Sequence, residues 1–258
     1  MMSWVGQYCI YVSDLETAIR FYETLGLVCT SHTDLDDAKE AIIENPDKGG
    51  RLQLAQKIER SGPIEMGNAF WKLYVATNDI QKLYKAAVDA GYRSKAESTH
   101  ADSESITTAS VEDPDGYEVV LIQRHPWSDD DETTYVWLDQ YSVYVSNLDR
   151  SLEFYELLGL ECTSRNETDT HRQATLERTG KGGKIQLAQQ VANGAPIDMG
   201  TSMWKLYVFT DDCEALHQRA VDAGHQSLID PMRPERWPVT ISFLSDPDGY
   251  QVELVQRD

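Results

Sequence analysis

The sequence predicts an α+β protein made of two tandem copies of one module, each module built from two βαβββ units. Two observations carry this prediction. Residues 7–124 align with residues 140–257 at a constant offset of 133 and without a gap. Inside each copy, alternating apolar and polar positions indicate short strands, and apolar positions three and four residues apart indicate two helices. A repeat of this length indicates that one structural module was duplicated and fused.

Five blocks of matching residues recur in both copies. With the first residue in each copy, they are QYxxYVS (Gln7, Gln140), FYExLGLxCTS (Phe21, Phe154), GGxxQLAQ (Gly49, Gly182), PIxMGxxxWKLYV (Pro63, Pro196) and DPDGYxVxLxQR (Asp113, Asp246). Between the copies lies a stretch with a proline and an acidic run, which is typical of a linker. We therefore expect module 1 at 1–125, an acidic linker at 126–138 and module 2 at 139–258.

The first βαβββ unit of module 1 is defined by its turn and cap residues. Ser13, followed three residues later by Glu16, predicts a helix that starts with a capping box, and Gly26 predicts its end. The pair Gly49-Gly50 predicts a hairpin turn into the last strand of the unit. The expected strands lie near 7–12, 28–31, 38–44 and 51–56.

The second unit follows the loop at Pro63. A helix is expected after Asp79 and should end at Gly91. The segment Asp113-Pro114-Asp115-Gly116 has the composition of a type I turn between the last two strands. The expected strands lie near 71–76, 105–111 and 117–122.

Strand alternation separates two faces of the expected sheet. In the first strand, Gln7, Cys9 and Tyr11 oppose an apolar set that includes Tyr8. The other strands divide in the same way, and Glu253 falls on the mixed face of the last strand of module 2. We expect the apolar face to pack on the helices. The mixed face, with amides, lysines and tyrosines, should line a ligand cup.

Charge and composition exclude several classes of function. The net charge is −20, from 43 acidic and 23 basic residues, and an acidic surface repels a phosphate backbone, so no nucleic-acid partner is expected. The acidity fits either simple solubility or a cationic ligand. No apolar run reaches the roughly 18–20 residues of a membrane span, and the first residues show no signal-peptide pattern. We therefore expect a cytoplasmic protein with no membrane partner. The four cysteines have no zinc-binding spacing.

The FYExLGL block and the closing DPDGYxVxL block together resemble the vicinal-oxygen-chelate superfamily, which includes glyoxalase I, extradiol dioxygenases and bleomycin-resistance proteins. The resemblance covers both repeats nearly end to end. It is strongest to the lactoylglutathione lyase branch, because a glutamine, Gln7, stands at the first-strand ligand position. It implies tandem modules with the fold of paired βαβββ units, in agreement with the pattern above.

The resemblance also implies a divalent metal, held by side chains of the first, fourth, fifth and eighth strands of a cup shared between modules. Carried over position by position, one cup contains Gln7, Gln53, Lys205 and Glu253, and the other contains Gln140, Gln186, Lys72 and Val120. In the first set, Gln7, Gln53 and Glu253 are the only metal-ligand candidates. An ammonium group beside a single carboxylate repels a dication. The resemblance thus leaves a metal cofactor open, and the charge count disfavours it.

Lys205 and Glu253 are the candidate catalytic residues. The lysine could stabilise a substrate oxyanion and the glutamate could move a proton. The alternative is a lysine that extends to the rim and an ordinary strand carboxylate. Arg233, Arg236 and Trp237 either grip a ligand or seal the contact between modules. The candidate substrate-binding residues are Gln7, Gln53, Gln140, Gln186, Lys72, Tyr11, Tyr144, Arg233, Arg236 and Trp237.

Two functions follow from these residues. The first is a glyoxalase-like lyase or isomerase acting on a small carbonyl or thiol-adduct substrate. The second is a small-molecule binding protein of the bleomycin-resistance type, which needs no metal ligands. Extradiol cleavage is disfavoured, because none of the six histidines falls on a ligand position. The expected partner is a small molecule. The two modules should pack as an intramolecular pseudodimer, and the sequence leaves open whether two chains also form a homodimer.

Overall fold

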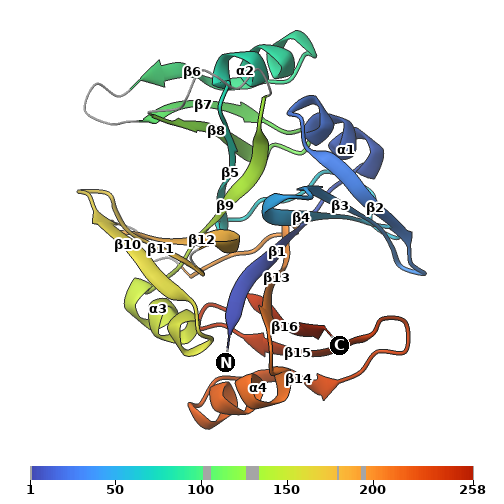
Figure 1. Cartoon of the computed structure of the whole chain (residues 1–258), viewed down its shortest axis with the longest axis vertical. Coiled ribbons are helices and arrows are strands. Elements are labelled where there is room, and N and C mark those ends of the chain that lie inside the picture. The colour runs from blue at the N-terminus through green and yellow to red at the C-terminus, as the bar shows by residue number, and fades with distance from the viewer. Residues whose placement is uncertain (1, 101–105, 126–133, 179, 193–195, 258) are drawn as a thin grey trace. The chain divides into compact units, whose positions relative to one another are not determined.

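The computed structural model describes the whole chain except residues 1, 101–105, 126–133, 179, 193–195 and 258 (Figure 1). The elements are β1 (Ser3–Tyr11), α1 (Leu15–Thr24), β2 (Val28–Asp34), β3 (Ala38–Asn45), β4 (Lys48–Lys57), β5 (Phe70–Thr77), α2 (Ile80–Asp89), β6 (Ser94–His100), β7 (Ile106–Glu112), β8 (Glu118–Arg124), β9 (Val136–Tyr144), α3 (Leu148–Leu157), β10 (Glu161–Glu167), β11 (His171–Arg178), β12 (Lys181–Gln190), β13 (Met203–Thr210), α4 (Cys213–Asp222), β14 (Ser227–Met232), β15 (Val239–Ser245) and β16 (Gln251–Arg257). The α+β prediction of tandem modules, each of two βαβββ units, is confirmed.

Two compact units divide the chain, and they do not coincide with the two repeats. Unit 1 comprises Met1–Ile10, Glu65–Phe70 and Ser142–Asp258, and unit 2 comprises Tyr11–Ile64 and Trp71–Tyr141. In unit 1 the strand order is β14-β15-β16-β13-β1-β12, and β11 and β10 continue from β12. In unit 2 the order is β6-β7-β8-β5-β9, and β4, β3 and β2 continue from β9. The opening strand of each repeat therefore pairs with the other repeat.

Aspartate and asparagine side chains cap the N-termini of the helices. Asp14, not Ser13, caps α1, and its carboxylate accepts a hydrogen bond from the backbone N–H of Thr17 at 2.7 Å. The expected Ser13–Glu16 capping box is therefore wrong. In a capping box the backbone N–H of Ser13 would donate to the side chain of Glu16, but here it donates to Asp115 Oδ2 at 3.0 Å. Asp79 caps α2 as expected.

The glycine pairs have a different role from the one expected. The turn between β3 and β4 lies at Pro46 and Asp47, and Gly49 stands inside β4 with a φ of 87°. A Cβ atom on Gly49 would lie 2.4 Å from the carbonyl oxygen of Leu138 on β9. The glycine thus permits the close approach of a neighbouring strand rather than a hairpin turn. Gly26 does end α1, with a φ of 85°.

The observed strands differ from the predicted ones at β6 and at the start of β9. Both faces of β1 are buried, since Tyr8 and Ile10 on the expected apolar side and Gln7 and Cys9 on the mixed side are each 5% exposed or less. Strand β6 was not expected, because its sequence Ser94–His100 is polar and carries no alternating pattern. Residues 101–105, which include the first residue of the strand expected at 105–111, and residues 126–133 of the expected linker lie outside the described residues. Strand β9 begins at Val136, inside the range expected for the linker.

Across the described ranges of the chain, none of the helices has the length and apolar character needed to cross a membrane.

The DPDGY turns anchor the last strand of each repeat. In unit 2, Asp113 Oδ1 accepts the backbone N–H groups of Asp115 and Tyr117, both at 2.9 Å, and Tyr22 Oη donates to Oδ2 at 3.3 Å. In unit 1, Asp246 makes the corresponding bonds to backbone N–H groups at 2.8 and 2.9 Å and to Tyr155 at 3.2 Å. Burial is the largest influence on both carboxyl groups and raises the pKa of each to about 7.

This burial predicts an unusual pH dependence of stability. An aspartate in an unfolded chain has a pKa of about 3.9, so the folded chain binds more protons between about pH 4 and pH 7. The contribution of Asp113 and Asp246 is then fully present below about pH 4 and is lost as the pH rises through about 7. We expect D113N/D246N to lose less free energy of unfolding than the wild type between about pH 5 and pH 8, measured by urea unfolding.

The control is Asp36→Asn, which removes an exposed carboxylate of the same chain. It should leave the pH slope of the wild type in place. Equal slopes for the wild type and the double variant would contradict the prediction.

Candidate functional site

A row of four side chains crosses the sheet of unit 1. In the strand registers, Gln7 on β1 faces Tyr207 on β13, Tyr207 faces Glu253 on β16, and Glu253 faces Phe243 on β15. Partners in register project from the same face of a sheet. Gln7 and Glu253 are buried, with 5% of each residue exposed. The row therefore places an amide, a phenol and a carboxylate side by side on the mixed face that the sequence predicts.

An ion pair connects Glu253 of this row to Lys205, which lies outside the row. Lys205 lies on β13 two residues before Tyr207, so both side chains share a face. Its Nζ atom is 2.6 Å from Glu253 Oε2, and the two side chains are 11% and 7% exposed. Three aromatic rings surround Nζ, with their centroids at 4.3 Å for Trp204, 4.8 Å for Tyr207 and 5.3 Å for Phe243. The ammonium is thus held by one carboxylate and by the negative faces of the rings.

Burial and charge act on Glu253 in opposite directions. Desolvation is the largest influence and raises the pKa of its carboxyl group, while the Lys205 ammonium and a hydrogen bond from Tyr207 lower it. The net direction is upward. A buried carboxylate with a raised pKa is a better proton acceptor than an exposed one, and the neighbouring ammonium can stabilise a negative oxygen.

A bulge in β1 sets the position of Gln7. The register shifts between Val5 and Gln7, so Gly6 is an extra residue opposite β13. A Cβ atom on Gly6 would lie 1.8 Å from the Phe209 ring, and only glycine leaves room for that ring. Gln7 Nε2 lies 3.9 Å from Cys9 Sγ, two residues along the same face.

Unit 2 contains the equivalent row with different chemistry. Tyr74 on β5 faces Val120 on β8, and Val120 faces Ser110 on β7. Lys72 shares the face of Tyr74, and its Nζ lies 4.4 Å from the Trp71 ring centroid. At the offset of 133, Val120 and Ser110 replace Glu253 and Phe243. Gln140 is buried on β9, the strand beside β5.

The remaining amides of the expected set have side-chain partners of their own. Gln53 belongs to unit 2, where its Nε2 donates to Glu40 Oε2 at 2.6 Å. Gln186 belongs to unit 1, where it accepts from Ser142 Oγ at 2.7 Å and donates to Gln173 Oε1 at 3.1 Å. Of the set Gln7, Gln53, Lys205 and Glu253, unit 1 therefore brings together all but Gln53.

The aromatic and cationic candidates have contacts of their own. The Tyr11 ring has Lys57 Nζ at 4.9 Å and the Arg60 guanidinium at 4.8 Å from its centroid. Tyr144 stacks on His171, with centroids 5.9 Å apart. The remaining candidates lie just after the end of β14 in the chain, and they are Arg233, Arg236 and Trp237. The Arg236 guanidinium lies 5.2 Å from the Trp237 ring, which is 48% exposed.

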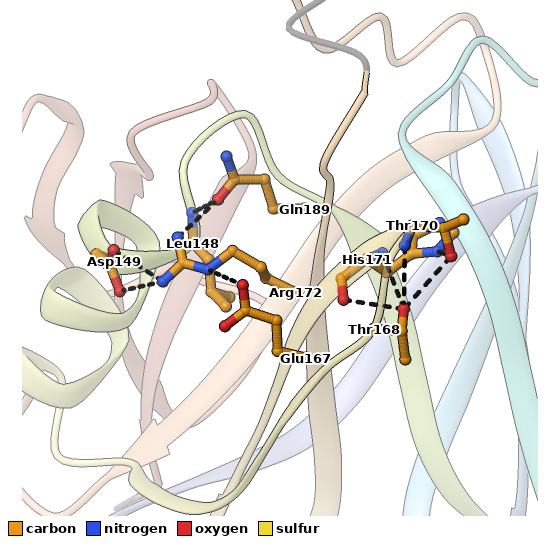
Figure 2. A network of polar contacts seen from close by, with 8 residues as sticks. All are labelled: Leu148, Asp149, Glu167, Thr168, Thr170, His171, Arg172 and Gln189. Atoms are coloured by element: carbon orange, nitrogen blue, oxygen red, sulfur yellow. Dashed lines mark hydrogen bonds and ion pairs between the residues drawn. The ribbon is translucent and has the colours of Figure 1, made fainter.

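Sequence analysis missed a cavity at the start of α3 that is lined mostly by charged and amide residues. It has a volume of about 220 Å³ and is lined by Leu148, Arg165, Asn166, Glu167, Arg172 and Gln173. Figure 2 shows Arg172 between Asp149 and Glu167, with its nitrogens 3.2 and 4.0 Å from their carboxylates, and close to Gln189. The adjacent turn is closed by Thr168 and His171. At the offset of 133, Arg172 corresponds to Lys39, Glu167 to Asp34 and Asp149 to Glu16, so the repeat itself carried a signal of this charged cluster.

Most of the chain matches one known protein superfamily. The sequence profile of the Glyoxalase/Bleomycin resistance protein/Dioxygenase superfamily matches the chain twice, at residues 4–121 and 137–254. The chain therefore belongs to this superfamily, and the expected resemblance is confirmed.

Curated relatives and solved structures agree with this assignment. A lactoylglutathione lyase of Oryza sativa subsp. japonica is 26% identical over 263 residues, covering 95% of this chain and 87% of the relative. A probable lactoylglutathione lyase of Vibrio parahaemolyticus is 31% identical over 119 residues, covering 44% of this chain and 85% of the relative. Glyoxalase I from Zea mays has a similar structure, with a TM-score of 0.88 and 22% identity, over 99% of this chain and 92% of that one. The similarity to the Zea mays structure shows the fold of this chain and nothing beyond the fold.

The side chains of unit 1 do not fit the divalent metal that the family resemblance implies. Among the described residues, no group of three His, Cys, Asp or Glu side chains could hold a metal ion. Glu253 is the only anionic member of the row, and Lys205 already neutralises it at 2.6 Å. At 4 Å and an effective dielectric of about 20, this ammonium would repel an incoming cation by roughly 4 kcal/mol per unit charge.

This misfit predicts that a histidine at position 205 would create metal binding. Lys205→His removes the repelling charge and adds an imidazole ligand beside Gln7 and Glu253. We expect stoichiometric zinc or nickel in Lys205→His and none in the wild type, measured by elemental analysis after purification with either metal. The matched control is Lys72→His, which should gain none because Val120 replaces the carboxylate. A stoichiometric metal in the wild type would contradict this account.

Proposed function

We propose that this protein is a glyoxalase I-like lyase or isomerase that acts on a small carbonyl or thiol-adduct substrate through Lys205 and Glu253. The observation that carries the proposal is the buried ion pair between these two side chains, at 2.6 Å on the mixed face of the sheet. Relatives named lactoylglutathione lyases that span almost the whole chain support the same class of reaction.

The arrangement supports a proton-transfer mechanism that uses only this chain's own groups. Glu253 takes the proton from the carbon next to the substrate carbonyl, and the electron pair moves onto the carbonyl oxygen as an enolate. The Lys205 ammonium stabilises that oxygen, and Gln7 can donate an amide hydrogen to a second substrate oxygen. Glu253 then returns the proton to the former carbonyl carbon, and the hydroxyl proton of the substrate passes to the former carbonyl oxygen, which completes an isomerisation without net gain or loss of atoms.

A second candidate is a non-catalytic small-molecule binding protein of the bleomycin-resistance type. The net charge of −20 favours it, because such a surface attracts cationic cargo. A ring cluster around a neutralised ion pair would serve a binding protein as well as an enzyme. Turnover separates the two candidates, since the binding protein would hold its ligand without converting it.

The direct test is turnover of a preformed hemithioacetal of a 2-oxoaldehyde and glutathione. We expect Glu253→Gln to lower kcat by about 100-fold or more, because the amide cannot accept the proton. Lys205→Ala should lower it by about 100-fold, because the oxyanion loses its stabilising charge. Chelator treatment should leave wild-type turnover unchanged.

The control for this test is Lys181→Ala. Lys181 is an exposed lysine of unit 1 that lies on the Trp4 ring, and its variant should turn over like the wild type. Full turnover by Glu253→Gln would remove the glutamate from the mechanism. Absence of turnover together with tight binding of a cationic ligand would favour the binding protein.

A further inference from the structure

The cavity of about 220 Å³ at the start of α3 is lined by Leu148 of that helix and by residues of β10 and β11. Arg172 of β11 extends toward the helix, where its Nη2 atom donates to the two carboxylate oxygens of Asp149 at 3.2 and 3.3 Å (Figure 2). Gln173, the next residue, belongs to the other face of β11 and accepts a hydrogen bond from Gln186 at 3.1 Å. An inference about this cavity therefore does not depend on the proposed lyase activity.

Three charged side chains share one side of the β10–β11 hairpin at this cavity. In the strand register Glu167 faces Arg172, and Arg165, two residues before Glu167, lies on the same face of β10. Two residues along a strand span roughly 6.6–6.8 Å. Arg165 and Glu167 thus present a positive group and a negative group at about that spacing.

Arg172 is fixed by its neighbours and leaves Glu167 available to a ligand. Besides the contacts with Asp149, Arg172 Nη1 donates to Gln189 Oε1 at 3.4 Å. Glu167 Oε1 lies 4.0 Å from Arg172 Nε, which is beyond hydrogen-bond range, and the Glu167 side chain is 73% exposed. Arg172 Nε and the Glu167 carboxylate can therefore each form a hydrogen bond with a ligand in the cavity.

Arg165 supplies a second guanidinium group. Its side chain bonds to the Cys162 thiol, and the carboxylates of Glu156 and Asp149 act on it only electrostatically. A guanidinium has five N–H donors and a thiol is a weak acceptor, so donors of Arg165 remain for a stronger acceptor. In repeat one His32 stands at the position of Arg165, and its Nε2 atom lies 3.8 Å from Glu16. The guanidinium is thus particular to repeat two.

The size and the charge of the cavity limit what it can hold. Its volume is below the roughly 300–1,000 Å³ of pockets for drug-sized molecules, so the ligand is small. The two arginines are balanced by Glu167 and Asp149, so a ligand with a net charge would leave one charge unpaired. A zwitterion pairs with both signs at once.

We propose that this cavity binds a small zwitterion, a free α-amino acid with a short apolar side chain. The carboxylate of the ligand accepts hydrogen bonds from Arg165 and Arg172 Nε, and its ammonium donates to Glu167. The two charged groups sit on one carbon, so with a hydrogen bond at each end they span about the distance of two strand residues. The apolar side chain lies toward Leu148.

The test is the binding of L-leucine, followed by the backbone amide signals in ¹H–¹⁵N NMR spectra of the full-length chain. Because the charged groups are exposed, we expect a dissociation constant of about 1 mM, with the largest shifts within 165–173. Arg165→Gln and Glu167→Gln should each weaken binding about fivefold. The matched control is Glu161→Gln, which removes another exposed carboxylate of β10, 3.6 Å from Arg178, and should bind like the wild type.

Two analogues of the probe separate the roles of the two charges. 4-Methylpentanoate lacks the ammonium and 3-methylbutylamine lacks the carboxylate, and the wild type should bind each about fivefold more weakly than L-leucine. The advantage of L-leucine over 4-methylpentanoate should vanish in Glu167→Gln and persist in Glu161→Gln, because only Glu167 contacts the ammonium.

The same spectra show whether each variant is folded, so loss of binding is separated from loss of structure. Equal wild-type affinity for L-leucine and 4-methylpentanoate would overturn the proposal. So would unchanged L-leucine affinity in either Arg165→Gln or Glu167→Gln, or the absence of wild-type shifts at about 20 mM L-leucine.

Discussion

Pairing between the opening strand of one repeat and the fifth strand of the other is the constraint on which the side-chain rows of both units depend. In unit 1, antiparallel pairing of β1 with β13 puts Gln7 beside Tyr207, and parallel pairing of β13 with β16 adds Glu253. The bulge at Gly6 fixes this register, because a side chain there would occupy the position of the Phe209 ring. A polar row on one face of a sheet therefore comes from segments about 200 residues apart, and no local motif contains it.

The two units share the same strand framework but differ in the side chains that it carries. Both keep a lysine and a tyrosine on the same face of the fifth strand, at Lys72 and Tyr74 and at Lys205 and Tyr207. One of them retains a carboxylate across the sheet and the other has Val120. In unit 1 the lysine and the carboxylate form a buried ion pair that is suited to moving a proton. In unit 2 both positions across the sheet differ, with Val120 in place of Glu253 and Ser110 in place of Phe243.

Sequence reasoning found the framework because periodicity and repetition are local signals. It located the helices, the mixed face and the lysine–glutamate pair, since alternation assigns each strand residue to a face. It failed where long-range geometry decides. Gly49 looked like a turn residue because the approach of Leu138 is invisible in the sequence. The rings around Lys205 were missed because Phe243 has no aromatic counterpart in repeat one.

The Lys205 ammonium stands where the family resemblance implies a metal ion. A crystal structure determined after soaking with nickel, with anomalous data collected at the nickel edge, tests it most directly. We predict no anomalous peak between Gln7 and Glu253, and electron density that joins Lys205 Nζ to the carboxylate. A strong peak at that place, with the lysine turned away from Glu253, would contradict the account.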